Sequence, residues 1–184
     1  MRNKSVLAIA ALALSASAHA LTLSGGSSFL NGSDTGNAWQ VTDTLPVGRA
    51  GSARYGVNLG LIDFGSQAVQ HNSGHLPGYQ PSPVAAFLPP QSNLASVTTH
   101  AIFALARISG RDGRVSTFAG MGPALYRQRV AFVNAPGATH TGLGLMATVG
   151  VAYHFGGWHV QATYERIFAH RSDNAVMVGV GVTL

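Results

Sequence analysis

The segment that decides the fold is the C-terminal stretch "NAVMVGVGVTL", residues 174–184. Its alternate residues form two faces: Val176, Val178, Val180, Val182 and Leu184 on one, and Ala175, Met177, Gly179, Gly181 and Thr183 on the other. The first face is bulky and branched, whereas the second is small or polar. A period of two residues predicts a β-strand whose two faces meet different surroundings.

The two preceding segments, 143–155 and 158–168, repeat this alternation and are separated only by "GG" at 156–157. In the second of them Trp158, Val160, Ala162, Tyr164 and Phe168 alternate with His159, Gln161, Thr163 and Glu165. Strands of about ten residues, apolar on one face and small or polar on the other, are typical of transmembrane β-barrels, which have lipid outside and a polar lumen inside.

The composition points the same way. Charged residues make up 9% of the chain, against roughly 25% in ordinary soluble domains. The absence of cysteine excludes a disulfide framework and a thiolate metal site. The net charge of +5 is spread along the chain, so nucleic-acid binding is not expected. A soluble lipocalin-like barrel or sandwich is the alternative, but it would place its apolar face inside and its polar face outside.

The N-terminus is expected to be a secretory signal over residues 1–20, followed by one barrel domain over residues 21–184. Basic "MRNK" precedes a short apolar run and the small-residue stretch "AHA" at 18–20. A membrane helix is the alternative, but the apolar run is shorter than the roughly 20 residues that a span needs. The predicted location is the outer membrane of a Gram-negative cell, reached through the periplasm.

The remaining strands are expected at 21–30, 38–47, 54–65, 95–109 and 115–133, giving eight in all. Short connections at 48–53, 110–114 and 156–157 alternate with longer ones at 31–37, 66–94, 134–142 and 170–174. This alternation predicts an all-β, eight-stranded, antiparallel up-and-down transmembrane barrel with short turns and both termini on the periplasmic side. Side chains fill the interior of a barrel of this size, so an open pore is not expected.

Four stretches resemble the small outer-membrane barrels of the OmpX-like, OmpA-like and opacity-type groups. They are "YGVNLGLIDFG" (55–65), "GMGPALYRQRV" (120–130), "GLGLMATVGVAYHFGGWHVQATYERI" (142–167) and "AVMVGVGVTL" (175–184). The resemblance implies a cell-surface protein that the barrel assembly machinery inserts into the outer membrane. Members of these groups usually end in phenylalanine, whereas this chain ends in Leu184.

Loops carry function on rigid scaffolds, and the long segment 66–94 is the best candidate for contact with a host or cell-surface ligand. Its apolar anchors would be Tyr79, Phe87 and Leu88. Three arginines near the predicted outer rim, Arg127, Arg129 and Arg166, could pair with lipopolysaccharide phosphates. Aromatic residues are expected at headgroup depth: Tyr153, Phe155 and Trp158 at the periplasmic side, and Tyr126, Tyr164 and Phe168 at the outer side.

The lumen is expected to hold polar residues that play a structural part. His100, His154 and His159 are expected to face inward, together with Glu165. A carboxylate in a dry interior needs a partner, and Arg54 and the lumen histidines are the candidates.

One motif suggests chemistry. His170 and Ser172 lie two residues apart, as they would on one face of a strand, and a serine activated by histidine could attack an acyl ester of lipid A. The stretch resembles the His-x-Ser-Asn motif of the outer-membrane lipid A deacylases, although Asp173 intervenes before Asn174. The main hypothesis is nevertheless a non-enzymatic scaffold that presents extracellular loops for surface interaction or adhesion, with no cofactor and no metal.

Overall fold

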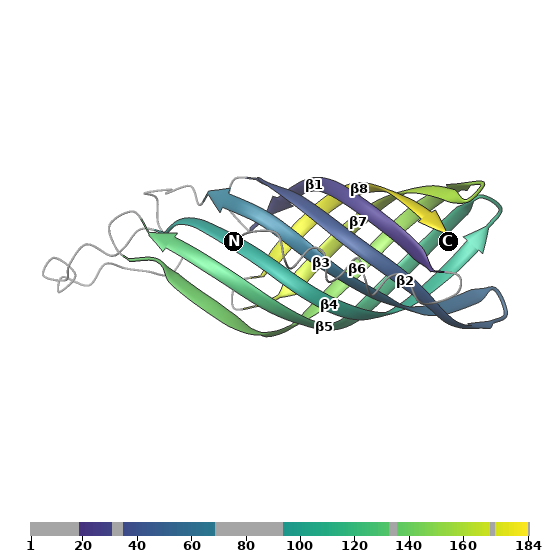
Figure 1. Ribbon diagram of the computed structural model, residues 1–184, viewed down its shortest axis with the longest axis horizontal. Helices are drawn as coiled ribbons and strands as arrows, with labels where there is room; N and C mark the ends of the chain where they lie inside the picture. Colours follow the sequence, from purple (N-terminus) through teal and green to yellow (C-terminus); the bar gives the residue numbers. More distant parts are fainter. Residues whose placement is uncertain (1–18, 31–34, 69–93, 133–135, 170–171, 184) are drawn as a thin grey trace, which may run out of the picture.

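A computed structural model describes residues 19–30, 35–68, 94–132, 136–169 and 172–183. Eight antiparallel strands form one closed barrel in chain order (Figure 1), which confirms the predicted fold class. The strands are β1 (Ala20–Phe29), β2 (Gly36–Ala50), β3 (Ala53–Ala68), β4 (Leu94–Asp112), β5 (Val115–Phe132), β6 (Ala138–Phe155), β7 (Trp158–Phe168) and β8 (Asp173–Thr183). Among the described residues, no helix is long and apolar enough to cross a membrane.

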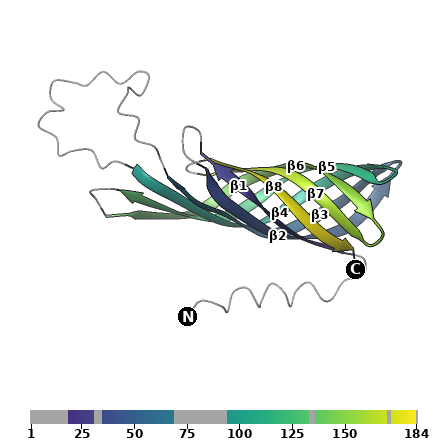
Figure 2. The same cartoon turned by 90° about the horizontal axis from the view of Figure 1, so that it is seen from above.

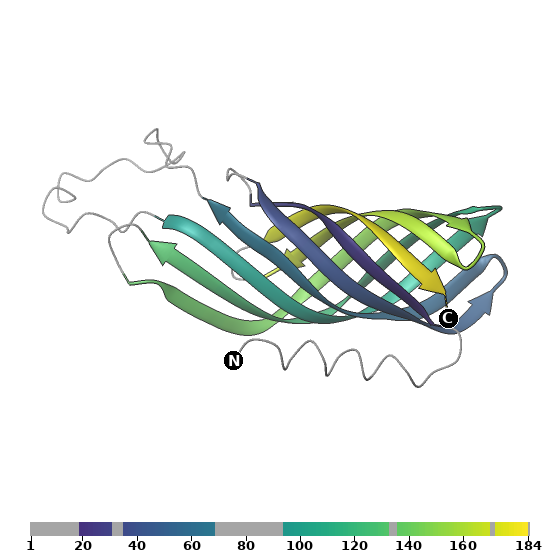
Figure 3. The ribbon, with the colours of Figure 1, turned by 45° about the horizontal axis from the view of Figure 1, so that its top comes forward.

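The barrel closes where the last strand meets the first. Ala20 pairs with Thr183, and Phe29 pairs with Asn174. As the predicted alternation of connections requires, β8 ends beside a short turn, where Thr183 N donates to Gly157 O at 2.8 Å. Figure 3 shows the end of β8 on the same side of the barrel as the short hairpins. We call this the turn end and the opposite one the loop end. Since short turns of such barrels face the periplasm, the turn end is the periplasmic end.

Two of the three turns are tighter than the sequence predicts, and the third, at 156–157, is as predicted. The tighter turns comprise residues 51–52 and 113–114, because β2 and β3 continue into the expected connection 48–53 and β4 continues into the expected connection 110–114. Gly51, Gly113 and Gly156 have φ angles of 59°, 56° and 64°. Two-residue hairpin loops favour this left-handed backbone, which glycine adopts without steric cost.

At the loop end, β3 to β6 reach farther than β7 and β8 (Figure 2), and β3, β4 and β6 are longer there than predicted. The expected loop 134–142 is partly strand, because Ala138 already pairs with Val130 of β5. A bulge between Asp63 and Ser66 interrupts the β3–β4 pairing. Gly65, with φ 66°, lies in this bulge, where a Cβ would collide with the backbone oxygen of Asn37.

The two faces of the barrel wall match the predicted assignment. Val176, Val178 and Val180 face outward, as do Leu143, Leu145 and Val149, and Val178 is 60% exposed. Alternate residues of the same strands, such as Met146 and Met177, are buried inside. A contiguous apolar exterior of this extent needs lipid around it, because water would not solvate it.

Candidate functional site

The middle of the lumen is filled by apolar side chains. Large ones with almost no exposure come from five strands: Ile62, Phe64, Phe103, Leu105, Met146, Ile167 and Met177. We call these seven residues the lumen plug. Inward positions of an eight-stranded barrel converge on a narrow axis, so side chains of this size meet and exclude solvent. The plug lies between polar groups of the turn end and polar groups of the loop end.

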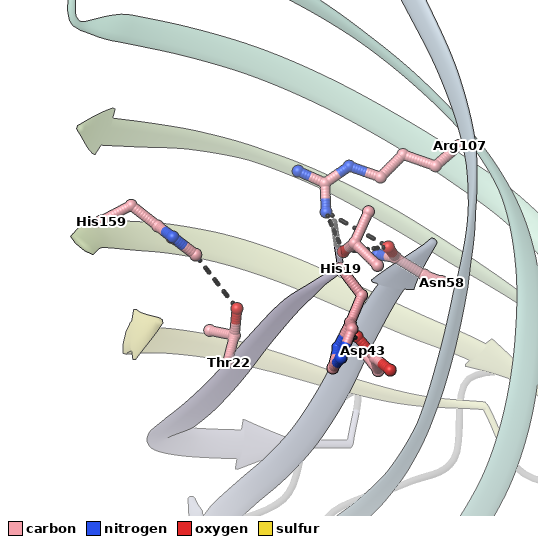
Figure 4. A network of polar contacts seen from close by, with 7 residues as sticks. His19, Thr22, Asp43, Asn58, Arg107 and His159 are labelled. Carbon is pink, nitrogen blue, oxygen red and sulfur yellow. Dashed lines mark hydrogen bonds and ion pairs between the residues drawn. The ribbon is translucent and has the colours of Figure 1, made fainter. Parts of the chain in front are cut away.

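Arg107 is the centre of the polar groups on the turn side of the plug. One terminal guanidinium nitrogen, Nη1, donates hydrogen bonds to Thr44 Oγ1 at 3.1 Å and to Asn58 Oδ1 at 3.3 Å (Figure 4). Thr44 in turn donates to Asn58 Oδ1 at 2.6 Å. The guanidinium carbon also lies 3.7 Å from the centroid of the Phe118 ring. A half-buried cation in a lumen needs such partners because it has lost part of its hydration.

Glu165 is the buried acid of the same region, with an exposed fraction of 2%. Its Oε1 accepts hydrogen bonds from Thr148 Oγ1 at 2.9 Å and from Gln40 Nε2 at 3.4 Å. The inward facing of Glu165 is therefore confirmed. Its hydrogen-bond partners are Thr148 and Gln40, and no ion pair joins it to Arg54 among the described contacts. The sequence could have indicated that Arg107 faces inward, because Arg107 shares a face of β4 with Phe103 and Leu105.

His154 and His159 face inward as predicted. Ser116 Oγ lies 2.8 Å from His154 Nε2. Thr22 Oγ1 lies 3.0 Å from His159 Nε2 (Figure 4). The two imidazole centroids are 5.5 Å apart. Each ring thus pairs with a hydroxyl group of another strand, and neither contacts Glu165 through a hydrogen bond within the described lumen. Figure 4 also shows His19, from the predicted signal, 3.1 Å from Asp43.

The prediction that His100 faces inward is wrong. Its side chain is 52% exposed, and its Nδ1 lies 3.2 Å from Asp63 Oδ1 on the outer face of the wall. The inward positions beside it are Thr99 and Ala101, which are buried. The simple rule of apolar outside and polar inside fails here because β4 extends beyond the apolar belt, where the outward face meets polar surroundings.

The three predicted rim arginines all face outward, but they form two separate groups. Arg127 and Arg129 lie on the exposed face of β5 near the loop end, whereas Arg166 on β7 lies 4.9 Å from the Phe168 ring. On the intervening strand β6, Arg127 pairs with Thr141 and Arg166 with Ala147. These two positions are six residues apart, which corresponds to about 20 Å along a strand.

Five of the six predicted aromatic anchors lie on the outer face. Tyr153, Phe155 and Trp158 do so at the turn end, and Tyr164 and Phe168 toward the loop end. The assignment of Tyr126 is wrong, because this residue is only 8% exposed and packs beside the lumen plug. Tyr126 follows the inward phase of β5, which it shares with Ala124 and Gln128.

The predicted loop and catalytic residues are only partly described. Tyr79, Phe87, Leu88 and His170 lie outside the described residues. Ser172 is half-buried immediately before β8, and the next residue, Asp173, is fully buried on the lumen side beside Thr99 and Gln128. Glu165 faces the lumen and is held by Thr148 and Gln40, so it is not positioned to orient a base at the outer rim.

The sequence matches no protein-family model and no curated protein. Its fold is similar to that of solved bacterial structures. Neisserial surface protein A (NspA) aligns with TM-score 0.54 and 15% identity over 91% of this chain and 96% of that one. Ail, the attachment invasion locus protein of Yersinia pestis, in complex with the heparin analogue sucrose octasulfate, aligns with TM-score 0.51 and 11% identity over 92% and 100%. The outer membrane enzyme PagL aligns with TM-score 0.50 and 6% identity over 90% and 99%.

The chain has the fold of the small outer-membrane β-barrels. Its own exterior is apolar where lipid would surround it, and the fold is that of proteins embedded in the bacterial outer membrane. The predicted location in the outer membrane agrees with both observations. The fold is shared by surface proteins and by an enzyme, so the choice between these roles depends on the residues of this chain.

Proposed function

We propose that this protein is a non-enzymatic outer-membrane scaffold that presents its loop end for surface interaction or adhesion. The observation that carries the proposal is the charged outer face at the loop end of β3 to β5. Asp63 and His100 lie together there, and Arg127 and Arg129 extend the polar surface on β5. This face lies just beyond the apolar pair Ile102 and Leu125.

The lumen supports a scaffold rather than a conduit. The plug fills the middle of the barrel with close-packed side chains, so a solute would have to displace several fully buried residues to pass. A wall held rigid in this way suits the display of loops, because it fixes the position of both strands from which each loop emerges.

The surface carries groups that recognise anions. Guanidinium groups bind phosphate and sulfate oxygens through directional, charge-assisted hydrogen bonds. We infer that Arg127 and Arg129 contact lipopolysaccharide phosphates at the outer rim, with Arg166 as a separate third contact. The loop 66–94, with Tyr79, Phe87 and Leu88 as its apolar anchors, would contact a host or cell-surface ligand. The barrel assembly machinery is the expected partner during insertion.

Cell adhesion tests the scaffold role. Bacteria that display the wild-type protein should adhere to cultured epithelial cells better than bacteria with the empty vector. Removal of residues 69–93 should abolish the gain while the barrel keeps its heat-modifiable mobility on gels. Undiminished adhesion of the folded deletion variant would refute the assignment to the loop.

The lipopolysaccharide contact has its own test. The double variant Arg127→Gln/Arg129→Gln should retain less lipopolysaccharide phosphate per barrel after detergent extraction. The matched control is Arg114→Gln at the turn end, which removes an equally exposed arginine and should leave the amount unchanged. Equal retention by all three proteins would contradict the contact.

A second candidate function is a lipid A deacylase, in which Ser172 attacks an acyl ester and His170 takes the hydroxyl proton. The observation that favours it is the half-buried position of Ser172 at the loop end of a barrel similar to PagL. Mass spectrometry of lipid A from cells that express the protein would show loss of one acyl chain. The change should disappear in Ser172→Ala and His170→Ala, and intact lipid A with the wild type would exclude the enzyme.

A further inference from the structure

The turn end of the lumen contains a cavity of about 220 Å³. It lies on the opposite side of the plug from the loop end, and none of the proposed surface contacts involves it. Three arginines line it, Arg54, Arg107 and Arg111, together with His154 and His159. Thr44 and Ser116 add hydroxyl groups to its wall.

The registers of the strands bring the three arginines together. Arg107, Ser109 and Arg111 occupy alternate positions of β4 and therefore share its inward face. Arg54 of β3 pairs directly with Ser109, so it lies beside the midpoint between the other two arginines. Arg107 and Arg111 are four residues apart, about 13 Å along the strand. The guanidinium groups of these three flexible side chains can thus reach the same cavity from two neighbouring strands.

The cavity has charge of one sign. No aspartate or glutamate is among the described residues that line it. Glu165 lies in the same region of the lumen but does not line the cavity, and its Oε1 is engaged by Thr148 and Gln40. A pocket lined by one sign of charge and enclosed by walls of low dielectric constant concentrates its field on a bound counter-ion.

The arginine side chains use some of their N–H donors within the barrel and keep others available for a ligand. Arg107 uses Nη1 for Thr44 and Asn58, and Arg111 uses Nε for the carbonyl oxygen of Gly113 at 2.9 Å. A guanidinium group has five N–H donors, so both residues retain others for a ligand. The side chain of Arg54 is exposed at the mouth. The site thus combines Arg107 inside the lumen, Arg54 and Arg111 nearer the turn end, and the hydroxyl groups of neutral residues.

We propose that the turn end of the lumen binds a small phosphate-type anion. Phosphate presents several oxygen atoms in different directions and so can engage guanidinium groups from separate positions, as a single carboxylate cannot. The volume is below the roughly 300–1,000 Å³ of pockets for drug-sized ligands, which favours a compact ligand such as a diphosphate. The anion would enter from the periplasmic side, either free in solution or as a phospholipid headgroup that reaches over the rim.

Titration calorimetry of the full chain in phosphate-free detergent micelles, with inorganic pyrophosphate as the probe, tests the proposal. The wild type should bind one pyrophosphate per barrel. Arg54→Gln and Arg111→Gln should each weaken binding by about 10-fold to 100-fold, the equivalent of one or two charge-assisted hydrogen bonds. Both positions are exposed at the turn end, so these variants should fold, whereas Arg107 is tied into the lumen network.

The matched control is Arg114→Gln. Arg114 is an exposed arginine at the same end, but its Nη1 donates to the hydroxyl group of Tyr153, an outward-facing residue, at 3.4 Å. This variant should change the affinity less than about twofold, because only a distant, screened charge is lost. No binding by the wild type would overturn the proposal, as would an equal loss in Arg114→Gln, which would mean that only general rim charge attracts the probe.

A second arm distinguishes the two sources of phosphate. The same titration in nanodiscs of phosphatidylglycerol should show unchanged affinity if the ligand is a free anion. Weakened pyrophosphate binding in nanodiscs would identify the lipid headgroup as the occupant, because the headgroup would compete with pyrophosphate for the cavity. In that case Arg54→Gln and Arg111→Gln should also reduce the difference in pyrophosphate affinity between micelles and nanodiscs. Phosphorus NMR of the nanodisc samples would then show a bound headgroup resonance that is lost in both variants.

Discussion

The hydrogen bonds of Arg107 make a quantitative prediction. Arg107→Met removes its hydrogen bonds to Thr44 and Asn58 and its contact with Phe118. Loss of a hydrogen bond from a charged donor typically costs about 1.5–3 kcal/mol, so loss of both should cost about 3–5 kcal/mol in the free energy of unfolding. Glu165→Gln should cost less, because the amide oxygen can still accept the hydrogen bond from Thr148.

The double variant Arg107→Met/Glu165→Gln shows whether the two residues act independently. Arg107 is hydrogen-bonded to Thr44 and Asn58, whereas Glu165 is hydrogen-bonded to Thr148 and Gln40. No direct ion pair joins the two side chains among the described contacts. The two single losses should therefore add within about 0.5 kcal/mol.

Urea titration in lipid vesicles, with the heat-modifiable gel band as the measure of folded protein, would give the three free energies of unfolding. A loss in the double variant that differs from the sum of the single losses by more than about 1 kcal/mol would refute their independence. Glu165→Asp is a useful control, because it retains the carboxyl group but shortens the side chain. It should cost more than Glu165→Gln, since the shorter side chain loses its reach to Thr148 and Gln40.

Three further predictions concern packing and hydrogen bonds in the wall. Gly122→Ala should destabilise the barrel by about 1–3 kcal/mol in urea titration, because its Cβ would collide with the backbone oxygen of Ala104. The control is Gly110→Ala, whose Cβ would have only one contact, at 4.0 Å. This variant should be neutral or more stable by up to about 1 kcal/mol. Equal effects of the two substitutions on stability would contradict the clash at Gly122. Phe64→Ala should cost about 3–5 kcal/mol by the same assay, since this plug residue has no exposed surface; a loss below about 1 kcal/mol would mean that the plug is loosely packed. Thr22→Val should cost about 1–3 kcal/mol by leaving His159 Nε2 without its hydroxyl partner, whereas Thr22→Ser should retain most of the stability.

The local pattern of the chain was sufficient to predict the barrel. Val176, Val178 and Val180 face lipid because a strand places alternate side chains on opposite faces, whatever its neighbours are. The turns were placed correctly because glycine-rich stretches separate the hairpin strands. The lengths of the turns after β2 and β4 were overestimated, because Arg49 and Arg111 look like turn residues in the sequence. Both residues lie within strands.

The errors at His100 and Tyr126 have two causes, the depth at which β4 leaves the lipid and the register of β5. The polarity rule of a membrane strand holds only at the depth of the lipid, and the sequence does not state where a long strand leaves it. At the loop end the outward face of β4 becomes polar, with Thr98 and His100, while inward Val97 is buried and apolar. Tyr126 faces inward for the same reason that its neighbour in phase, Gln128, does: the register of β5 sets the face.

The sequence by itself determined the class of fold, the two faces of most strands and the end at which the short turns lie. These features depend on residues one or two positions apart, so local chain geometry decides them. Only the tertiary structure decided that Arg107 is hydrogen-bonded to Thr44 and Asn58, that seven side chains plug the lumen and that Arg54, Arg107 and Arg111 line one cavity. Those contacts join strands far apart in the chain. The level at which their side chains meet depends on strand tilt and register, which closure of the whole barrel imposes.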